Sequence, residues 1–473
     1  MQSTNKNDKK LINLIRGWPS PHLLPAALLK KAADKALTDP SIFVPALQYA
    51  PDPGYQPLRE ELATWLGRAY KTPSRAEEIC ITGGASQSIA CVLQSFTDPV
   101  YTRAVWAVTP CYFLAFPIFE DAGFAGRLRA VPEDDEGIDL EFLERGLRSV
   151  DEAAAAAGGD DRPPYKTPGP HRKLYRHIIY IVPTCSNPSG KTTSLSHRRA
   201  LVNLARRHNA LIISDDVYDF LQWPILPQAP PTSTALTPLP SPSPTPLLPR
   251  LSDIDIALGP SEHDPAGKSF SHAISNGSFS KLVGPGMRTG WVHGTSDFAY
   301  GLSQTGSSRS GGAPSQIAAA MLTSLLATGD LDTHLSNAVR PALQARHAAA
   351  LAAVKSELGG MGVAVRESSE VGKGQFGGYF LWLTLPRGLK GMDVAELARR
   401  EENLIVAAGE GFEVPGDEGG VRCEGNLRVC FSWEEVEDVV EGVRRLGRVL
   451  RRVEDGVKTE EGNGGGMGSE VFK

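Results

Sequence analysis

Short apolar runs alternate with helical segments over the first two thirds of this chain, and this alternation limits its fold more than any other feature. Helical patterns such as Ser86–Phe96 and Ser196–His208 separate several of the apolar runs. Strands that alternate with helices are typical of a mostly parallel sheet covered on both faces. We therefore predict an α/β fold whose ligand site lies at the carboxyl ends of the strands. The predicted strands are Ile79–Thr82, Ala104–Val108, His177–Val182, Ala210–Ser214, Ala273–Ser278 and Thr289–His293.

The pattern changes after about residue 325, where a long helical stretch is followed by isolated strands. This change predicts a second, smaller α+β unit. Its predicted elements are a helix at Leu331–Leu358, strands at Gly378–Leu385 and Leu427–Trp433, and helices at Met392–Glu401 and Glu434–Val453.

Composition excludes several classes of protein. The 473 residues are 41% hydrophobic, enough for two or three units with sizeable cores. With 49 basic and 54 acidic residues, the chain has no strong positive field, so we expect no nucleic-acid partner. It has neither an apolar run of about 20 residues nor an apolar signal core behind Met1–Lys10, which indicates a soluble cytoplasmic protein without a membrane contact.

Three stretches look like insertions or a tail. Residues 151–172 are rich in Ala, Gly and Pro, and residues 224–250 are dense in Pro, Ser and Thr. Proline removes backbone donors and fixes φ, so both stretches are predicted to be irregular surface loops. Residues 456–473 are rich in Gly and Glu and are predicted to be a disordered tail. The six cysteines contain no CxxC pair, and we expect them to be free buried thiols without a disulfide or metal site.

The segment Ser275–Trp291 (SNGSFSKLVGPGMRTGW) combines a lysine with two hydroxyls and an arginine. Lys281 follows a predicted strand, and Ser278, Ser280 and Arg288 lie around it in sequence. A reactive lysine has to be reachable and partly desolvated, and a guanidinium beside hydroxyls suits a phosphate dianion. A Gly/Ser loop with a solvent-facing lysine is the alternative.

Two further predicted strands end in polar side chains. The run LIISDDVY (Leu211–Tyr218) ends in two carboxylates, which could face a protonated pyridine nitrogen or bind a divalent cation. The run IVPTCSNPSG (Ile181–Gly190) offers the Asn187 side chain, although an ordinary Asn-Pro turn has the same sequence.

The segment Ile79–Phe96 (ICITGGASQSIACVLQSF) runs from a strand through a glycine turn into a helix. The backbone N–H groups of Gly84, Ala85 and Ser86 would then lie at a helix N-terminus, which suits phosphate. The sequence matches neither the dinucleotide fingerprint nor the P-loop, and a routine strand–helix turn remains possible.

The order of these motifs along the chain is more specific than any one of them. A glycine turn, an aromatic residue, an asparagine turn, an aspartate strand, a lysine loop and a late arginine resemble class I/II aminotransferases, enzymes that use pyridoxal 5′-phosphate (PLP). Within that family, Ala46–Leu66 (ALQYAPDPGYQPLREELATWL) resembles the branch of 2-aminoadipate and kynurenine aminotransferases. The resemblance covers roughly residues 11–450 outside the insertions. It implies the PLP-dependent transferase fold type I, with a mostly parallel seven-stranded sheet in a large domain and a smaller α+β domain.

The resemblance also implies roles around the cofactor ring. Lys281 would hold PLP as a Schiff base and carry the proton between the substrate Cα and the cofactor. Asp215 would pair with the pyridinium nitrogen, Asn187 and Tyr218 would hydrogen-bond the phenolic oxygen, and Tyr112 would stack on the ring. A charged ring accepts the electrons left when the Cα proton is removed, so Asp215 would keep the ring charged.

The remaining roles concern the phosphate, the substrate and the domains. Arg428 would bind the substrate carboxylate with help from Gly17 and Asn187, and Tyr49 would reach the phosphate from the second subunit of a homodimer. The expected domains are an N-terminal segment at 1–45 that joins the small domain, a large PLP-binding domain at 46–325 and a small domain at 326–455. The phosphate contacts implied by the family are Ala85, Ser86, Ser278, Ser280 and Arg288.

Three positions depart from the family pattern. Ser186 stands where a glutamine usually precedes the asparagine, Ala85 stands where a hydroxyl is commoner, and the segment between Asp215 and Lys281 is unusually long. The expected reaction moves an amino group from an amino acid, such as 2-aminoadipate or an aromatic amino acid, to a 2-oxo acid such as 2-oxoglutarate. Arg16 and Arg309 are candidates for contacting a side-chain carboxylate.

Two other functions use the same fold. A PLP-dependent lyase or decarboxylase would need the same residues, since the angle of the breaking bond to the ring decides the reaction. A ligand-sensing regulator would carry an N-terminal helix-turn-helix domain, for which we expect no room before the first motif.

Overall fold

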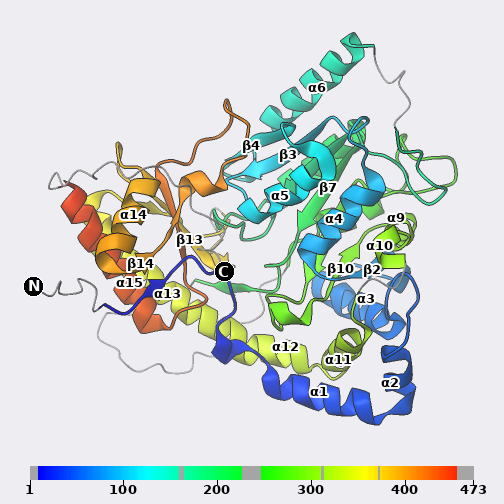
Figure 1. Cartoon of the computed structure of the whole chain (residues 1–473), viewed down its shortest axis with the longest axis horizontal. Coiled ribbons are helices and arrows are strands. Elements are labelled where there is room, and N and C mark those ends of the chain that lie inside the picture. Colours follow the sequence, from blue (N-terminus) through cyan, green and yellow to red (C-terminus); the bar gives the residue numbers. More distant parts are fainter. Residues whose placement is uncertain (1–8, 159–164, 226–246, 310–313, 371–372, 455–473) are drawn as a thin grey trace, which may run out of the picture.

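A computed structural model describes residues 9–158, 165–225, 247–309, 314–370 and 373–454. The larger part is built on an eight-stranded sheet, called here the large-sheet unit (Figure 1). Its strand order is β2-β10-β9-β7-β6-β3-β4-β5. Strands β9, β7, β6, β3 and β4 are parallel neighbours, whereas β10 runs antiparallel to both of its neighbours. The strands are β2 (Ile79–Thr82), β3 (Ala104–Thr109), β4 (Leu128–Asp134), β5 (Gly137–Ile138), β6 (His177–Ile181), β7 (Ala210–Asp215), β9 (Ala273–Ser278) and β10 (Gly290–His293).

Both faces of this sheet are buried because its strands are apolar on both sides. On β3, Val105 and Ala107 join one core, while Ala104, Trp106 and Val108 join the other. This alternation is the period-two pattern of a strand. The first core contains side chains of α4 and α9, and the second contains side chains of α6, α7 and α8.

The predicted mostly parallel α/β fold is confirmed, with one more strand than the family resemblance implied. The short β5 extends the sheet by pairing antiparallel with β4. We did not predict β4, because Pro132 and three charged residues interrupt its apolar pattern.

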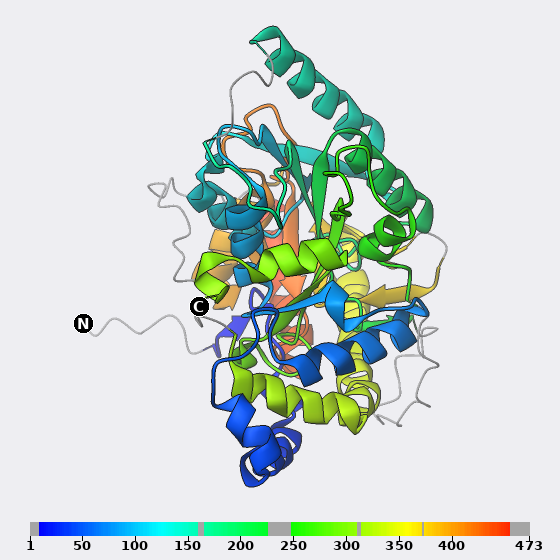
Figure 2. The same cartoon turned by 90° about the vertical axis from the view of Figure 1, so that its right-hand side faces the viewer.

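The helices of the large-sheet unit surround the sheet and extend below it, and α6 projects from the body of the molecule (Figure 2). None of the described helices is both long and apolar enough to cross a membrane. These helices are α1 (Ala26–Thr38), α2 (Pro40–Ala46), α3 (Gln56–Tyr70), α4 (Ala85–Phe96), α5 (Phe116–Phe119), α6 (Leu140–Ala156), α7 (Leu195–Arg207), α8 (Leu251–Ala257), α9 (Ser296–Ser303), α10 (Gly306–Arg309) and α11 (Gln316–Ala327).

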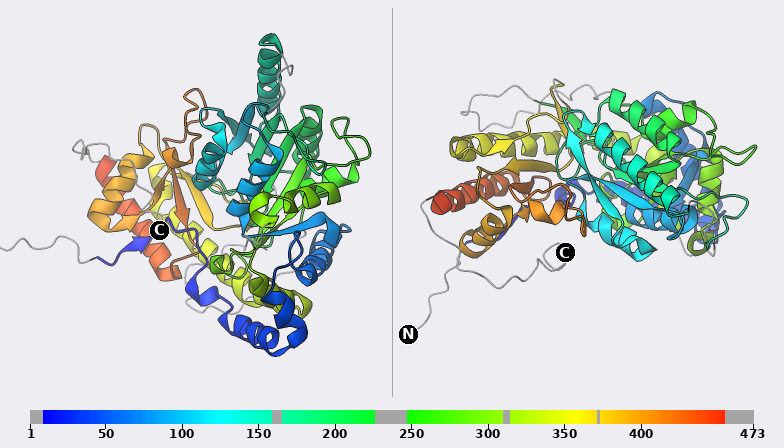
Figure 3. Two further views of the ribbon diagram at one scale, coloured as in Figure 1. Left: turned by 45° about the vertical axis from the view of Figure 1, so that its right-hand side comes forward. Right: turned by 90° about the horizontal axis from the view of Figure 1, so that it is seen from above.

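A smaller part, called here the small-sheet unit, lies beside the first (Figure 3). Its four-stranded sheet has the order β11-β13-β16-β15, and all its pairs are antiparallel. The N-terminal β1 (Ile12–Asn13) pairs with β14 (Leu404–Ile405), and β8 (Gln222–Pro224) pairs with β12 (Gln375–Gly377). The other elements are α12 (Asp330–His334), α13 (Arg340–Leu358), β11 (Ala364–Val365), β13 (Phe380–Thr384), α14 (Gly391–Glu402), β15 (Ala407–Ala408), β16 (Asn426–Cys430) and α15 (Val436–Glu454).

The predicted loops are only partly tested. The prediction that residues 151–156 are irregular is wrong, because they form the last part of α6. Their alanines favour a helix, and the Asp139 side chain caps its start by accepting a hydrogen bond from the Phe142 N–H. Of the predicted loop at 224–250, residues 226–246 lie outside the described residues, as do residues 159–164 and the predicted tail. All six cysteines are free and buried, as expected.

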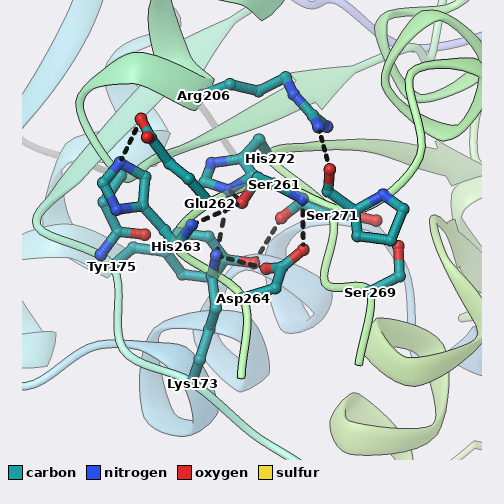
Figure 4. Close-up of polar contacts among 12 residues, drawn as sticks. Lys173, Tyr175, Arg206, Ser261, Glu262, His263, Asp264, Ser269, Ser271 and His272 are labelled. Carbon is teal, nitrogen blue, oxygen red and sulfur yellow. Dashed lines mark hydrogen bonds and ion pairs between the residues drawn. The ribbon is translucent and has the colours of Figure 1, made fainter. Parts of the chain in front are cut away.

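A buried polar network holds the segment that leads into β9 (Figure 4). The Lys173 ammonium donates to Asp264 Oδ1 at 2.8 Å and to His272 Nε2 at 3.0 Å. His272 Nδ1 lies 2.8 Å from the Ala210 carbonyl oxygen, to which it donates. The Ser261 hydroxyl lies 2.8 Å from His272 Nε2. His272 is therefore a neutral ring that accepts at Nε2, and it fixes this loop to the amino end of β7.

Candidate active site

Most predicted site residues surround one cavity of about 420 Å³, called here the strand-end cavity. It lies where β6, β7 and β9 end and α4 begins, as predicted from the sheet topology. The predicted residues that line it are Gly17, Ala85, Ser86, Tyr112, Asn187, Asp215, Tyr218, Ser278, Ser280, Lys281, Arg288 and Arg428.

Lys281 lies in the turn after β9, and its ammonium faces the cavity. Lys281 Nζ donates to the Gly17 carbonyl oxygen at 2.6 Å and lies 5.4 Å from the centre of the Tyr379 ring. Burial lowers the pKa of Lys281 to about 8, and the Arg428 charge adds to this effect, while Asp215 opposes it. An amine with this pKa is easily deprotonated near neutral pH and can act as nucleophile or base.

Asp215 ends β7 with one engaged and one free carboxylate oxygen. Oδ2 accepts a hydrogen bond from the Tyr180 hydroxyl at 2.8 Å, whereas Oδ1 is buried with no hydrogen-bond partner among the described residues. Burial raises the pKa of Asp215 to about 6, which the Tyr180 bond and the Lys281 charge partly oppose. An orphaned buried carboxylate oxygen fits a ligand that brings a protonated nitrogen, such as a pyridinium ring.

The neighbouring Asp216, unlike Asp215, does not line the strand-end cavity. Asp216 Oδ1 accepts from the Ser214 hydroxyl at 2.5 Å, so the two carboxylates have different partners. No group of three metal-ligating side chains occurs in the ranges that the structure describes.

Several donors that line the cavity could hold an anion. The Ser278 hydroxyl donates to Ser280 Oγ at 2.9 Å, and both side chains line the cavity. Arg288 reaches the turn before α4 and donates to the Gly83 carbonyl oxygen at 2.8 Å. At Gly84, φ is +107°, and a Cβ there would lie 3.0 Å from Arg288 Nη2, so this turn needs glycine. Two hydroxyls, a guanidinium and a helix N-terminus together suit a phosphate dianion.

Arg428 also lines the cavity, from β16 of the small-sheet unit. Its Nη1 donates to Asn187 Oδ1 at 2.8 Å, and its Nη2 donates to the Ile15 carbonyl oxygen at 2.7 Å. Its guanidinium carbon lies 4.0 Å from the centre of the Phe380 ring. Burial lowers the pKa of Arg428 to about 10, so the side chain is still charged at neutral pH. A fixed buried cation of this kind suits a carboxylate.

Two tyrosines complete the wall near Asp215. Tyr218 is buried, and its burial raises its pKa well above the usual value. Burial and the nearby Asp215 charge raise the pKa of Tyr112 to about 12. Both phenols are therefore neutral at physiological pH and available as hydrogen-bond donors.

Three predicted residues have different outcomes. Arg16 lines the cavity, with its guanidinium carbon 5.2 Å and 5.5 Å from the Trp18 and Trp433 ring centres. Arg309 does not line it; its side chain is 66% exposed and pairs with Asp52 at 3.7 Å. Tyr49 is 87% exposed and lies outside the cavity of its own chain.

Sequence reasoning missed Tyr180 and Tyr379. Tyr180 supports Asp215, and the Tyr379 hydroxyl donates to the Lys281 carbonyl oxygen at 3.3 Å. A signal existed for Tyr180, because it places a hydroxyl in the otherwise apolar centre of a fully buried strand. Tyr379 carries no comparable signal in its local sequence.

Comparisons with known proteins agree with this geometry. The sequence model of the family described as "Aminotransferase class I and II" matches residues 12–446. The chain therefore belongs to this family of PLP-dependent aminotransferases, and the donors around the strand-end cavity fit that cofactor.

Individual relatives extend over almost the whole chain. An uncharacterized protein of Saccharomyces cerevisiae is 33% identical, covering 93% of this chain and 97% of the relative. The 2-aminoadipate transaminase of Thermus thermophilus is 28% identical, covering 93% of this chain and 90% of the relative. Among solved structures, the Pyrococcus horikoshii kynurenine aminotransferase has a TM-score of 0.71 at 23% identity, covering 96% of this chain and 93% of its own.

Proposed function

We propose that this protein transfers an amino group from 2-aminoadipate, an aromatic amino acid or a similar donor to a 2-oxo acid such as 2-oxoglutarate. The observation that carries the proposal is that Lys281 and Arg428 both line one cavity. A base and a carboxylate clamp then hold one amino acid between them. The named substrates of the Thermus and Pyrococcus relatives support this range of donors.

Different residues of the chain have different roles around the cofactor. Bound PLP supplies an electron sink for the charge left when the substrate Cα loses its proton. Lys281 would hold the cofactor and move that proton, and Asp215 would keep a proton on the ring nitrogen through its free Oδ1. Asn187 and Tyr218 would hydrogen-bond the phenolic oxygen, and Tyr112 would pack against the ring.

The phosphate and the substrate are held at opposite ends. Arg428 binds the substrate carboxylate, with Gly17 and Asn187 beside it. Arg16 contacts a distal carboxylate of a dicarboxylic donor, and the adjacent Trp18 packs against longer side chains. The phosphate donors are Ala85, Ser86, Ser278, Ser280 and Arg288.

We also propose a cytoplasmic homodimer in which Tyr49 serves the partner's phosphate site. A single chain exposes large apolar side chains near Tyr49, including Val44 at 52% and Leu47 at 62%. Burial of such a patch is the usual reason for a stable subunit contact. In each chain, β1 and residues 326–455 form the small domain and residues 46–325 form the large one, against which α1 and α2 pack through α11.

A donor panel tests the function. Purified holoenzyme is assayed with 2-aminoadipate, kynurenine, phenylalanine and glutamate against 2-oxoglutarate and pyruvate, and the 2-oxo acid formed is measured. We expect transamination, with kcat about 10²- to 10⁴-fold lower in Lys281→Ala, because a positioned acid–base group contributes that much. The exposed Lys30→Ala on α1 is the control. Release of ammonia or CO₂ without oxo-acid exchange would instead assign the lyase or decarboxylase function.

A further inference from the structure

A second and larger cavity, of about 580 Å³, lies between the large-sheet and small-sheet units and is called here the junction cavity. One wall comes from the ends of β3 and β4 and from the Asn187 turn, through Pro110, Glu133 and Lys191. The other wall comes from β11 and β13, through Arg366 and Trp382. It shares no lining residue with the strand-end cavity.

The charges of the junction cavity favour an anion. Arg366 lines it without a hydrogen-bonded or ion-paired partner in the part of the chain that the structure describes, whereas the carboxylate of Glu367, which also lines it, pairs with Lys355 at 2.7 Å. Lys191 donates to the Asp134 carbonyl oxygen at 2.6 Å, and its ammonium lies 3.6 Å from Glu133. The Glu133 side chain is only 6% exposed, and its carboxylate already accepts from the Ser189 hydroxyl at 2.7 Å. Burial raises the pKa of Glu133 to about 7, while the nearby charges of Lys191 and Arg366 act to lower it.

The remaining wall contains polar side chains, such as Thr109, Ser368 and Arg422, and a group of apolar and aromatic ones. Pro110, Pro132, Val365 and Val421 are half-buried, and so is the Trp382 indole. Proline and indole faces accept a flat or branched apolar group, whereas a purely inorganic ion would leave them unused.

We propose that the junction cavity is a second ligand site, which binds a small organic carboxylate with an aromatic or branched body. Arg366 and Lys191 hold the carboxylate, and Trp382 packs against the body. Because both units contribute, the ligand bridges them and favours one relative position of the two.

Three connections link this site to the strand-end cavity. Pro110 lines the junction cavity, and Tyr112, two residues on, lines the strand-end cavity. In the same way, Ser189 lines the junction cavity, and Asn187, two residues before it, lines the strand-end cavity. The Trp382 ring packs edge-on against Phe412 at 5.5 Å, and the Arg428 guanidinium carbon lies 4.9 Å from the Phe412 ring centre.

Calorimetric titration of the PLP-loaded protein with phenylacetate tests the proposal. Phenylacetate has the required carboxylate and ring but no amino or oxo group that can react. We expect saturable binding at the junction cavity that Arg366→Gln weakens about ten- to hundredfold, as expected for loss of a charged hydrogen bond. The control Arg387→Gln removes an exposed arginine of the same unit outside the cavity and should leave the affinity unchanged.

Further arms separate the remaining outcomes. Binding of phenylacetate at Arg428 would have the same affinity in Arg366→Gln. If this were the only binding observed, the proposal would be overturned. Val365→Trp fills the junction cavity without altering its charge and should abolish the binding of phenylacetate there. This second variant keeps the test valid if Arg366→Gln folds poorly. The neutral 2-phenylethanol should bind at least about tenfold more weakly. Inorganic phosphate binding as tightly as phenylacetate would overturn the assigned ligand class.

Discussion

Arg16 carries a charge into the substrate end of the strand-end cavity, between two indole rings. Arg16→Gln should lower kcat/KM for 2-aminoadipate about 10- to 100-fold, because it removes a charged hydrogen bond to the distal carboxylate. Phenylalanine should be affected by less than roughly threefold, since it has no such group. Steady-state rates with both donors measure the difference, with Arg309→Gln as control. An equal loss with both donors would mean that Arg16 only shapes the cavity.

Tyr180 is a positioning residue, since it acts through Asp215. Its hydroxyl stabilises the charged carboxylate, so Tyr180→Phe should raise the pKa of Asp215. The acidic limb of the pH–kcat profile should then move to higher pH, and kcat should fall about tenfold. Tyr175→Phe, which removes another buried hydroxyl bonded to the Ser271 carbonyl oxygen, is the matched control. A lower kcat with an unmoved acidic limb would indicate a packing role only.

His272 makes the loop before β9 sensitive to pH. Burial and the adjacent Lys173 charge lower the pKa of His272 to about 3, whereas an unfolded chain has a histidine pKa of about 6.5. The unfolded state therefore binds the proton more readily, and stability is complete above about pH 6.5 and falls as the pH drops below it. This one group contributes a slope of about 1.4 kcal/mol per pH unit in that range.

Urea unfolding at several values between pH 5 and pH 7 measures this slope. We expect His272→Asn to be less stable at pH 7 but to lose stability less steeply on acidification. Groups that titrate in both proteins, such as Glu133 and His347, cancel in the comparison. The exposed His22→Gln should retain the wild-type slope. A parallel pH dependence in wild type and His272→Asn would remove His272 as the cause.

Elements were predictable where a local pattern decides them. The strands that carry the site were placed within a residue or two, since β7 begins with four apolar residues and both β7 and β9 end at polar residues. Helix α6 continues into the predicted loop because the alanines at 153–156 have high helix propensity and the glycines of this stretch begin only at Gly158. The predicted helix Leu331–Leu358 is interrupted by a π-helical turn at Leu335–Val339, a local backbone choice that the periodicity does not record.

The site was predictable for a different reason. Lys281, Asp215 and Asn187 follow strands, so the sheet topology alone brings them together. The bond between Tyr180 and Asp215 depends on the register of two neighbouring strands, which the sequence does not state. The junction cavity was not predictable, because its walls come from two units whose packing no local motif describes.

At the scale of the whole molecule, the proposed dimer predicts a shared site. Tyr49→Phe should weaken PLP binding about 10- to 100-fold, because a hydrogen bond to a charged phosphate is lost. Titration of the apoprotein with PLP measures the affinity, and light scattering after gel filtration should show two chains per particle. Tyr165→Phe, at a tyrosine that is 88% exposed elsewhere, is the control. A protein that is fully active as a monomer would contradict both the proposed dimer and the role of Tyr49.

The bond from Arg428 Nη2 to the Ile15 carbonyl oxygen joins the first described strand region to one of the last. The ribosome adds about 5 to 20 residues per second, so Ile15 waits many seconds before its partner is synthesised. Until then the growing chain can fold the strands that carry Lys281 and Asp215, but it lacks Arg428, the residue that we propose binds the substrate carboxylate. With that role, substrate recognition follows the folding of these strands, and we expect a product truncated before Arg428 to bind amino acids poorly.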